Sequence, residues 1–300
     1  MANNPKLIVI LGQTASGKSD LAVKLAKKFK GEVVSADSRQ VYKGMDIGTG
    51  KITKKEMMGI PHHLLSVASP KRRFTVAQYR KLALKSIKKV IKNKKIPFLV
   101  GGTGFYIQSI VDGIIIPEVK PDWSLRAKLE KKKTKDLFNL LKKLDLKRVK
   151  SIDKNNRRRL IRALEIVMKT KKPIPPLKKL PPQFNLLIIG VKKSPSELKK
   201  LIKQRLIKRL KQGMVAEVKK LKKAGLSWQR LEEFGLEYRY IAKYLQEKIT
   251  YKEMIEKIQK KDEHYARRQI TWFKRDKRIH WITNHNQAQK LVKHFIFVEK

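Results

Sequence analysis

The chain has 300 residues, of which 41% are apolar and 33% charged, so it can bury a substantial core. Lys and Arg number 74 against 25 Asp and Glu, which gives a formal net charge of +49. Such a charge attracts polyanions, so nucleic acid is the first partner to consider and an anionic membrane surface the second. The excess runs along the whole chain, however, so a lysine-rich composition with no binding role remains an alternative.

Cysteine is absent, which excludes disulfides and thiolate metal sites. The first apolar run, residues 7–11, is too short for the core of a signal peptide or for a membrane span, and no later run is long enough to span. The sequence therefore predicts a cytoplasmic protein with no membrane partner. We expect it to be a monomer.

Strand and helix patterns alternate in the first part of the chain. Short, branched apolar runs at 7–11, 32–36 and 97–100 are typical of buried strands. Apolar residues recur at helical spacing over 20–29 and 76–91. This alternation predicts an α/β fold with a parallel sheet.

The pattern changes after residue 113. Residues 119–185 carry 22 Lys and Arg against 6 Asp and Glu, with helical periodicity and no convincing strand. A proline-rich link follows at 173–182, and residues 184–191 return to a buried-strand pattern. We therefore predict a P-loop α/β core, residues 1–118 and 184–300, interrupted by a basic helical domain, residues 119–183. Long helices are expected around 196–225 and 251–275.

The first predicted strand leads into a phosphate-binding motif. Residues 12–19 match G-x-x-x-x-G-K-[ST], with a strand before and a helix after. The glycines let backbone N–H groups point inward, and the start of the helix favours anions. Lys18 adds a charge for the terminal phosphates, and the Ser19 hydroxyl is a candidate Mg²⁺ ligand. The predicted diphosphate- or nucleotide-binding residues are Gly12, Gln13, Thr14, Ala15, Ser16, Gly17, Lys18 and Ser19.

The other two predicted strands end in polar or glycine-rich segments. Asp37 follows the second strand and Thr103 the third, and ligands bind at the carboxyl ends of parallel strands. Asp37 is a candidate general base, or a partner that hydrogen-bonds to a ligand of the metal, with a turn cap as the alternative. The third strand does not end in the Asp that a kinase often has, which weakens that interpretation.

Six stretches in this order form a recognisable set: residues 12–19, 37–49, 61–65, 101–106, 159–165 and 268–272. Together they resemble the tRNA dimethylallyltransferases, the isopentenyl transferases that modify the adenine next to the anticodon. The resemblance covers nearly the whole chain, and the run from 37 to 49 combined with 61–65 is specific.

The resemblance implies transfer of a dimethylallyl group from dimethylallyl diphosphate to N6 of adenine 37 in tRNA. Lys18 and Ser19 with Mg²⁺ would then neutralise the departing diphosphate, with Arg205 as a further contact. Asp37 would accept the proton from N6, and Thr103 would help position the base. The implied contacts to the tRNA anticodon stem-loop are Asp37, Ser38, Arg39, Gln40, Thr103, Arg126, Arg158, Arg159 and Arg162.

Three departures from the family pattern bear on the site. Gln13 stands where many relatives have proline, and we expect little effect. Leu201 stands where relatives often have arginine, so we expect Arg205 to carry the diphosphate contact alone. The stretch 235–238 differs from its commoner form, which leaves the role of the neighbouring helix open.

Three alternatives remain. A P-loop kinase of a small metabolite would leave the basic insertion unexplained. An isopentenyl transferase acting on free adenine nucleotides would not need that insertion. A non-enzymatic RNA-binding module would not need a complete phosphate site with an aligned carboxylate.

Overall fold

The computed structural model describes residues 4–114, 119–175 and 180–297. The chain divides into two compact units, Met1–Gly113 with Pro181–Lys300, and Ile114–Leu180. The predicted limits of the inserted domain, residues 119–183, stay a prediction. Residue 118, where the first part of the core was predicted to end, lies outside the described residues. No helix among the described residues is both long and apolar enough to cross a membrane.

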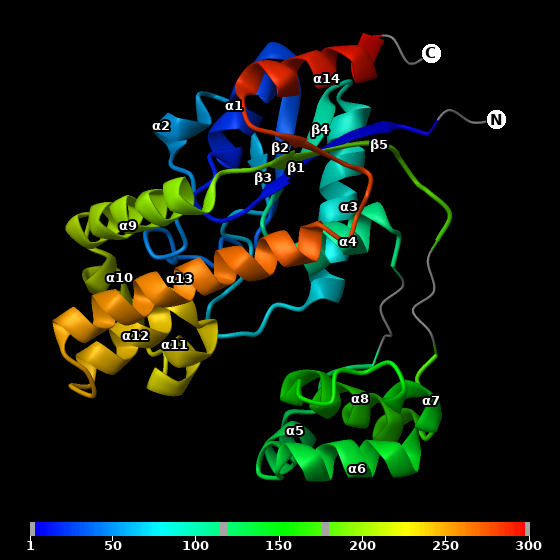
Figure 1. Ribbon diagram of the computed structural model, residues 1–300, viewed down its shortest axis with the longest axis vertical. Helices are drawn as coiled ribbons and strands as arrows, with labels where there is room; N and C mark the ends of the chain where they lie inside the picture. Colours follow the sequence, from blue (N-terminus) through cyan, green and yellow to red (C-terminus); the bar gives the residue numbers. More distant parts are fainter. Residues whose placement is uncertain (1–3, 115–118, 176–179, 298–300) are drawn as a thin grey trace. The chain divides into compact units, whose positions relative to one another are not determined.

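The first unit is built on a six-stranded sheet in which every pairing is parallel (Figure 1). The strand order is β3-β2-β4-β1-β5-β6. This confirms the predicted parallel α/β fold; the two edge strands, β3 and β6, were not predicted because they are short. The strands are β1 (Lys6–Gly12), β2 (Gly31–Ala36), β3 (His62–His63), β4 (Ile96–Gly101), β5 (Asn185–Val191) and β6 (Ile279–Ile282).

Both faces of the sheet are buried under helices. Leu7 and Val9 of β1 pack in one cluster with α3 (Val76–Lys92) and α4 (Gly104–Val111). Ile8 and Ile10 pack in another with α1 (Lys18–Lys28) and α14 (His285–Phe297), on the opposite face (Figure 1). Burial on both faces explains why β1 is a continuous apolar run rather than an alternating one.

The C-terminal helices form a third cluster against the segment that follows β2. The predicted helix over 196–225 is two helices, because Gly213 between them adopts φ 93°, which ends the first helix. The predicted helix over 251–275 is a single long one. The remaining helices of this unit are α2 (Lys54–Met57), α9 (Pro195–Lys211), α10 (Met214–Lys223), α11 (Trp228–Phe234), α12 (Leu236–Leu245) and α13 (Tyr251–Phe273).

In the second unit the described residues 119–175 form helices, which have their own apolar cluster. Leu137 and Leu141 pack against Leu160 and Leu164 at its centre, all four with no exposed surface. Its helices are α5 (Trp123–Glu130), α6 (Thr134–Leu144), α7 (Leu146–Val149) and α8 (Arg157–Thr170).

A buried carboxylate ties the helices of this unit together. Glu165 Oε1 accepts the backbone N–H of Asp122 at 2.6 Å and Nε–H of Arg126 at 2.8 Å. Its Oε2 accepts from Arg126 Nη2 at 2.7 Å and from Arg162. Burial alone would raise the pKa of Glu165, but these bonds hold it below its usual value. The ion pairs therefore outweigh the cost of burying the charge.

We expect Glu165→Gln to lower the local unfolding free energy of this unit by about 3 kcal/mol, because two arginines lose a buried partner. Amide hydrogen exchange of α5 and α8 in the full chain measures this change. Since the folded pKa of Glu165 lies below its ordinary value of 4.5, the wild type should keep the stabilisation above pH 4.5 and lose it as the pH falls through the folded pKa. Glu130→Gln, an exposed position on α5, is the control; equal exchange in both variants would contradict the assignment.

Candidate active site

The phosphate-binding loop runs from the end of β1 into α1. Gly17 is the N-cap of α1 with φ 85°, a conformation that favours glycine. Within the described part of the chain no side chain caps this helix, so its first N–H groups remain for an anion. A Cβ on Gly12 would lie 2.9 Å from Ser16 Oγ and from the carbonyl oxygen of Val191. The backbone therefore has the form that an anion-binding loop requires.

Two cations contact this loop directly. Lys18 Nζ donates to the carbonyl oxygen of Gln13 at 3.1 Å, and Arg205 donates to the Thr14 hydroxyl. Burial, with a smaller contribution from Arg205, lowers the pKa of Lys18 to about 8. Burial and the neighbouring Arg209 lower the pKa of Arg205 to about 10. Crowded cations disfavour one another, and a bound polyanion would relieve the repulsion.

Helix α9 supplies the two arginines near the phosphate loop, Arg205 and Arg209, which lie one turn apart. Arg209 is buried and its Nη1 donates to Glu237 Oε1 at 3.0 Å, so its charge is paired within the protein. Leu201, one turn before Arg205 on the same helix, has no charge to add. Arg205 is therefore the arginine of α9 whose side chain reaches the phosphate loop.

Asp37 lies directly after β2, where it closes a tight turn. Its Oδ1 accepts the backbone N–H groups of Arg39 at 2.7 Å and Gln40 at 3.2 Å. Its Oδ2 has no hydrogen-bond partner among the residues that the structure describes. The turn fixes the orientation of the carboxylate with one oxygen while the other remains for a proton. The turn-cap interpretation of Asp37 is therefore confirmed, and its role as a general base stays a prediction.

The loop after β4 brings Thr103 against this turn. A Cβ on Gly101 would lie 2.2 Å from the carbonyl oxygen of Ala36, so only glycine allows the two strands to end this close. Thr103 N–H donates to the same carbonyl at 3.2 Å. Thr103 Oγ1 accepts the backbone N–H of Ser38 at 3.0 Å and donates to Ser38 Oγ at 3.4 Å.

Tyr265 of α13 completes this side of the site, and nothing in the motif analysis pointed to it. Burial, followed by the Asp37 carboxylate, raises the pKa of the Tyr265 hydroxyl, and the nearby Thr103 side chain lowers it to a smaller extent. The hydroxyl therefore stays protonated and able to donate at neutral pH. Its position at helical spacing before two motif residues, Gln269 and Trp272, was the only signal available.

Arg39 and Gln40 hold the turn to the rest of the unit. Arg39 Nη1 donates to the Ser38 carbonyl at 3.4 Å, and its guanidinium lies 5.9 Å from the ring centre of Phe234. Gln40 Nε2 donates to the carbonyl oxygen of Gly50 at 3.1 Å. The side chains predicted to contact RNA are thus partly engaged within the protein.

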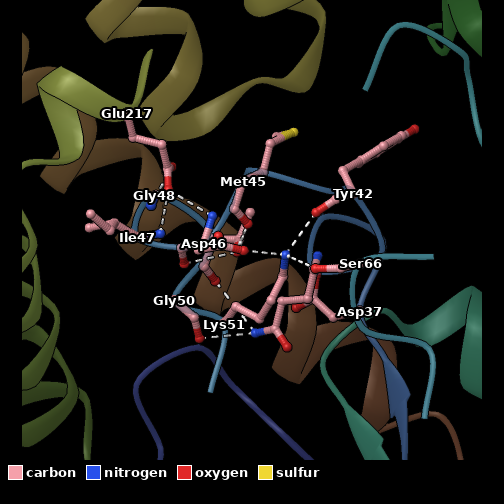
Figure 2. A network of polar contacts seen from close by, with 12 residues as sticks. Asp37, Tyr42, Met45, Asp46, Ile47, Gly48, Gly50, Lys51, Ser66 and Glu217 are labelled. Atoms are coloured by element: carbon pink, nitrogen blue, oxygen red, sulfur yellow. Dashed lines mark hydrogen bonds and ion pairs between the residues drawn. The ribbon is translucent and has the colours of Figure 1, made fainter. Parts of the chain in front are cut away.

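The segment 45–51 is fastened by a carboxylate that sequence reasoning missed (Figure 2). Glu217 of α10 accepts the backbone N–H groups of Asp46 and Ile47, both at 2.7 Å, and of Gly48 at 3.0 Å. Tyr238 Oη donates to the same carboxylate at 2.6 Å. The stretch 235–238, which differs from the commoner family form, therefore has a definite contact. Its ring leaves no room for a Cβ on Gly48, which would lie 2.8 Å away.

Lys51 fastens the other side of the same segment, as Figure 2 also shows. Its Nζ donates to the Tyr42 carbonyl at 2.7 Å, to Ser66 Oγ at 2.8 Å and to Asp46 Oδ1 at 2.5 Å. The specific run 37–49 is therefore a framework of internal hydrogen bonds around the Asp37 turn. Most of its polar side chains support the backbone rather than project from it.

The candidate RNA contacts of the helical unit fall into two groups. Arg126 and Arg162 are half-buried and paired with Glu165. Arg158 and Arg159 are exposed at the start of α8. Their neighbour Arg157, part of the same basic cluster, turns inward to the Glu130 carbonyl oxygen. The sequence could not separate these groups, because an ion-paired arginine and a solvated one look alike in it.

A family model described as IPP transferase matches residues 40–276. The chain belongs to the IPP transferase family. It is 38% identical to the tRNA dimethylallyltransferase of Acetivibrio thermocellus, over 96% of this chain and 95% of that protein. It is 42% identical to that of Caldanaerobacter subterraneus, over 92% and 91%. The family expected from the motifs is thereby confirmed.

Solved structures agree with this assignment. The tRNA isopentenylpyrophosphate transferase of Bacillus halodurans superposes with a TM-score of 0.71 and 35% identity, covering 98% of this chain and 95% of that one. A eukaryotic dimethylallyltransferase acting on tRNA gives a TM-score of 0.83 at 26% identity, covering 99% and 80%. The IPP transferase fold thus extends over essentially the whole chain.

We expect Glu217→Gln to loosen the segment 46–48, because an amide NH₂ cannot accept the N–H groups that the carboxylate oxygen accepts. A loss of about 2 kcal/mol corresponds to roughly 30-fold faster amide exchange at these residues. Hydrogen-exchange mass spectrometry of the peptide spanning 45–51 measures it. Glu256→Gln removes the same charge from an exposed position on α13 and should leave the rate unchanged. An unchanged rate in Glu217→Gln would mean that the carboxylate does not hold this segment.

Proposed function

We propose that this chain transfers the dimethylallyl group of dimethylallyl diphosphate to N6 of adenine 37 in tRNA. The observation that carries the proposal is the placement of an oriented carboxylate, Asp37, beside a cationic phosphate-binding loop. A phosphate loop alone serves many reactions. An acceptor site with a proton-accepting group next to it suits alkylation of an amine, in which diphosphate leaves and a proton is lost.

In the proposed reaction the N6 amine attacks the allylic carbon, and the carbon–oxygen bond to diphosphate breaks with its electron pair on oxygen. Negative charge grows on the leaving group, where Lys18, Arg205 and the N–H groups at the start of α1 lie. Asp37 Oδ2 accepts the proton that N6 releases. The hydroxyls of Thr103 and Tyr265 lie beside Asp37, where they can hydrogen-bond to the acceptor adenine.

Mg²⁺ is the cofactor that we propose for this site. No group of three or more His, Cys, Asp or Glu residues in the described chain could hold a metal ion by itself. Mg²⁺ does not need one, because it binds through few protein oxygens together with phosphate oxygens and water. The Ser19 hydroxyl, exposed in the first turn of α1, fits as that protein ligand. When bound, the ion would neutralise charge on the diphosphate.

The anticodon stem-loop of tRNA is the proposed second substrate. Enzymes that modify a base take it out of its stack, so the acceptor adenine would enter the site next to Asp37 and Thr103. The net charge of +49 suits a polyanionic partner. Arg158 and Arg159 are the proposed phosphate contacts of the helical unit, whereas Arg126 and Arg162 act there by maintaining its structure.

We expect Asp37→Asn to reduce the turnover of dimethylallyl transfer to an unmodified tRNA by about 10²–10⁴-fold, because an amide cannot accept the proton. The amide oxygen can still accept the two backbone N–H groups, so folding should be retained. Mass spectrometry of the digested RNA follows the added five-carbon unit. Asp136→Asn, exposed on α6, is the matched control.

Two outcomes would count against the proposal. Full activity of Asp37→Asn would remove the base assignment. Absence of transfer by the wild type, with ATP consumed in the presence of a small acceptor, would favour the kinase alternative.

We expect the combined change Arg158→Ala and Arg159→Ala to weaken the binding of different tRNAs to the same extent and to flatten the salt dependence of that binding. Loss of two phosphate contacts should reduce the slope of log affinity against log salt by about 1.5. Binding of tRNA measured at several salt concentrations tests this. Lys27→Ala with Lys28→Ala removes the same charge from the exposed end of α1 and should leave the slope unchanged. Equal effects in the two pairs would mean that only the overall charge matters.

A further inference from the structure

One face of α13 lies against both halves of the site. Asp262, Ala266, Gln269 and Phe273 follow one another at spacings of four, three and four residues, and all are buried. This spacing places them in one row along the helix. Two of the four are polar, which is costly on a buried face unless each has a partner.

Gln269 connects two loops that come from different strands. Its side-chain carbonyl oxygen accepts the backbone N–H of Thr14, in the phosphate loop after β1, at 2.7 Å. Its side-chain NH₂ donates to the carbonyl oxygen of Gly102, in the loop after β4, at 2.9 Å. Thr14 belongs to the loop that would hold the leaving diphosphate. Gly102 directly precedes Thr103, which lies beside Asp37 at the acceptor side.

The primary amide of Gln269 is suited to make both of these bonds. The Thr14 N–H can only donate and the Gly102 carbonyl can only accept, so the bridge needs an acceptor and a donor on one side chain. Glutamate of the same length could not donate when ionised, and methionine could do neither. The chemistry of the two partners also fixes which way the amide of Gln269 points.

Gly102 is shaped to this bridge. A Cβ there would lie 2.2 Å from Gln269 Nε2, so the amide occupies the space that any side chain would need. Two further contacts join α13 to the same loops. Gln13 Nε2 donates to the carbonyl oxygen of Ala266 at 3.2 Å, and the ring of Trp272 would lie 2.4 Å from a Cβ on Gly104.

We propose that Gln269 is a positioning residue that sets the distance between the leaving group and the acceptor amine. This inference rests on the proposed function. α13 serves as a rigid support, and the Gln269 amide fixes the phosphate loop and the acceptor loop to it at one point. Transfer requires the attacking nitrogen and the allylic carbon at near-contact distance, and a misplacement of about 1 Å costs roughly 100-fold in rate. The residue touches neither substrate.

The test compares Gln269→Met with Gln259→Met, a change of the same kind two to three turns earlier on α13, where the Gln259 side chain donates a hydrogen bond to Glu263 on the same helix. Turnover at saturating substrates should fall about 10–100-fold in Gln269→Met and stay unchanged in Gln259→Met. The KM for each substrate, and the affinity for inorganic pyrophosphate and for tRNA separately, should stay within about threefold, because each half of the site remains intact.

A second pair of variants removes the dependence on one substitution. Gly102→Ala forces the Gln269 amide out of its place, so it should lower turnover in the wild-type background. In a Gln269→Ala background the same change places the Cβ at an ordinary contact distance, 3.4 Å, from the carbonyl oxygen of Gly12, and it should cost little more. This non-additivity distinguishes a bridge from two independent structural effects.

Three results would overturn the inference. These are unchanged turnover in Gln269→Met, a turnover loss fully accounted for by weaker pyrophosphate binding, or additive effects of the Gly102 and Gln269 changes. A wild type that transfers nothing to tRNA would instead remove the proposed function. The transfer assay on the wild type detects that failure by itself, so it is not confused with a failure of the inference about Gln269.

Discussion

The candidate site depends on the order of three neighbouring parallel strands. β4 lies between β2 and β1, and Gly101 at its end is in register with Ala36 on one side and Leu11 on the other. The phosphate loop, the glycine loop and the Asp37 turn therefore start at the same level of one sheet edge. Because carboxyl ends of parallel strands share an edge, three short loops can meet there without crossing the sheet. Gly101 allows β2 and β4 to end this close together, since any side chain there would meet the Ala36 carbonyl.

The parts of the site that the sequence predicted are those whose chemistry lies in consecutive residues. The phosphate loop is recognised because glycine, lysine and serine occur at fixed offsets between a strand and a helix. Asp37 and Thr103 were predicted as site residues because Asp37 directly follows a buried strand and Thr103 lies in the short loop after another. The order of the strands in the sheet was not needed for either prediction, although it is what brings them together. The strands that were missed, β3 and β6, are too short to show a periodic pattern.

Apart from Arg205, the residues that contact the site from distant helices were not predicted, and the reason is physical. Glu217, Tyr265 and Gln269 bind backbone groups or loop hydroxyls, and these partners have no side-chain identity that a sequence pattern could reveal. A weaker signal did exist for α13. Its buried row begins with Met254 and Ile258 and then places a carboxylate and an amide at the following core positions, among apolar ones. A polar residue at a core position of a helix requires a hydrogen-bond partner. For Gln269 the partners are the backbone groups of the two site loops.

The charge around the phosphate loop is balanced only in part, and this partial balance suits a site for an anion. Two buried carboxylates, Glu237 and Asp262, lie near three cations. Glu237 pairs closely with Arg209, which fixes that arginine against the segment around Gly48. Asp262 lies 3.9 Å from Arg205, too far for a full hydrogen bond, and burial together with Glu237 raises its pKa.

The consequence is that Arg205 is oriented without being neutralised. Its guanidinium points to the Thr14 hydroxyl, and Lys18 rests on a carbonyl oxygen, so neither charge is consumed by a close internal carboxylate. A fully paired set of cations would have to break ion pairs before it could bind diphosphate, and an entirely unpaired set would destabilise the fold by repulsion. The structure lies between these limits: Arg209 is paired and maintains the framework, and Arg205 and Lys18 remain available to an anion.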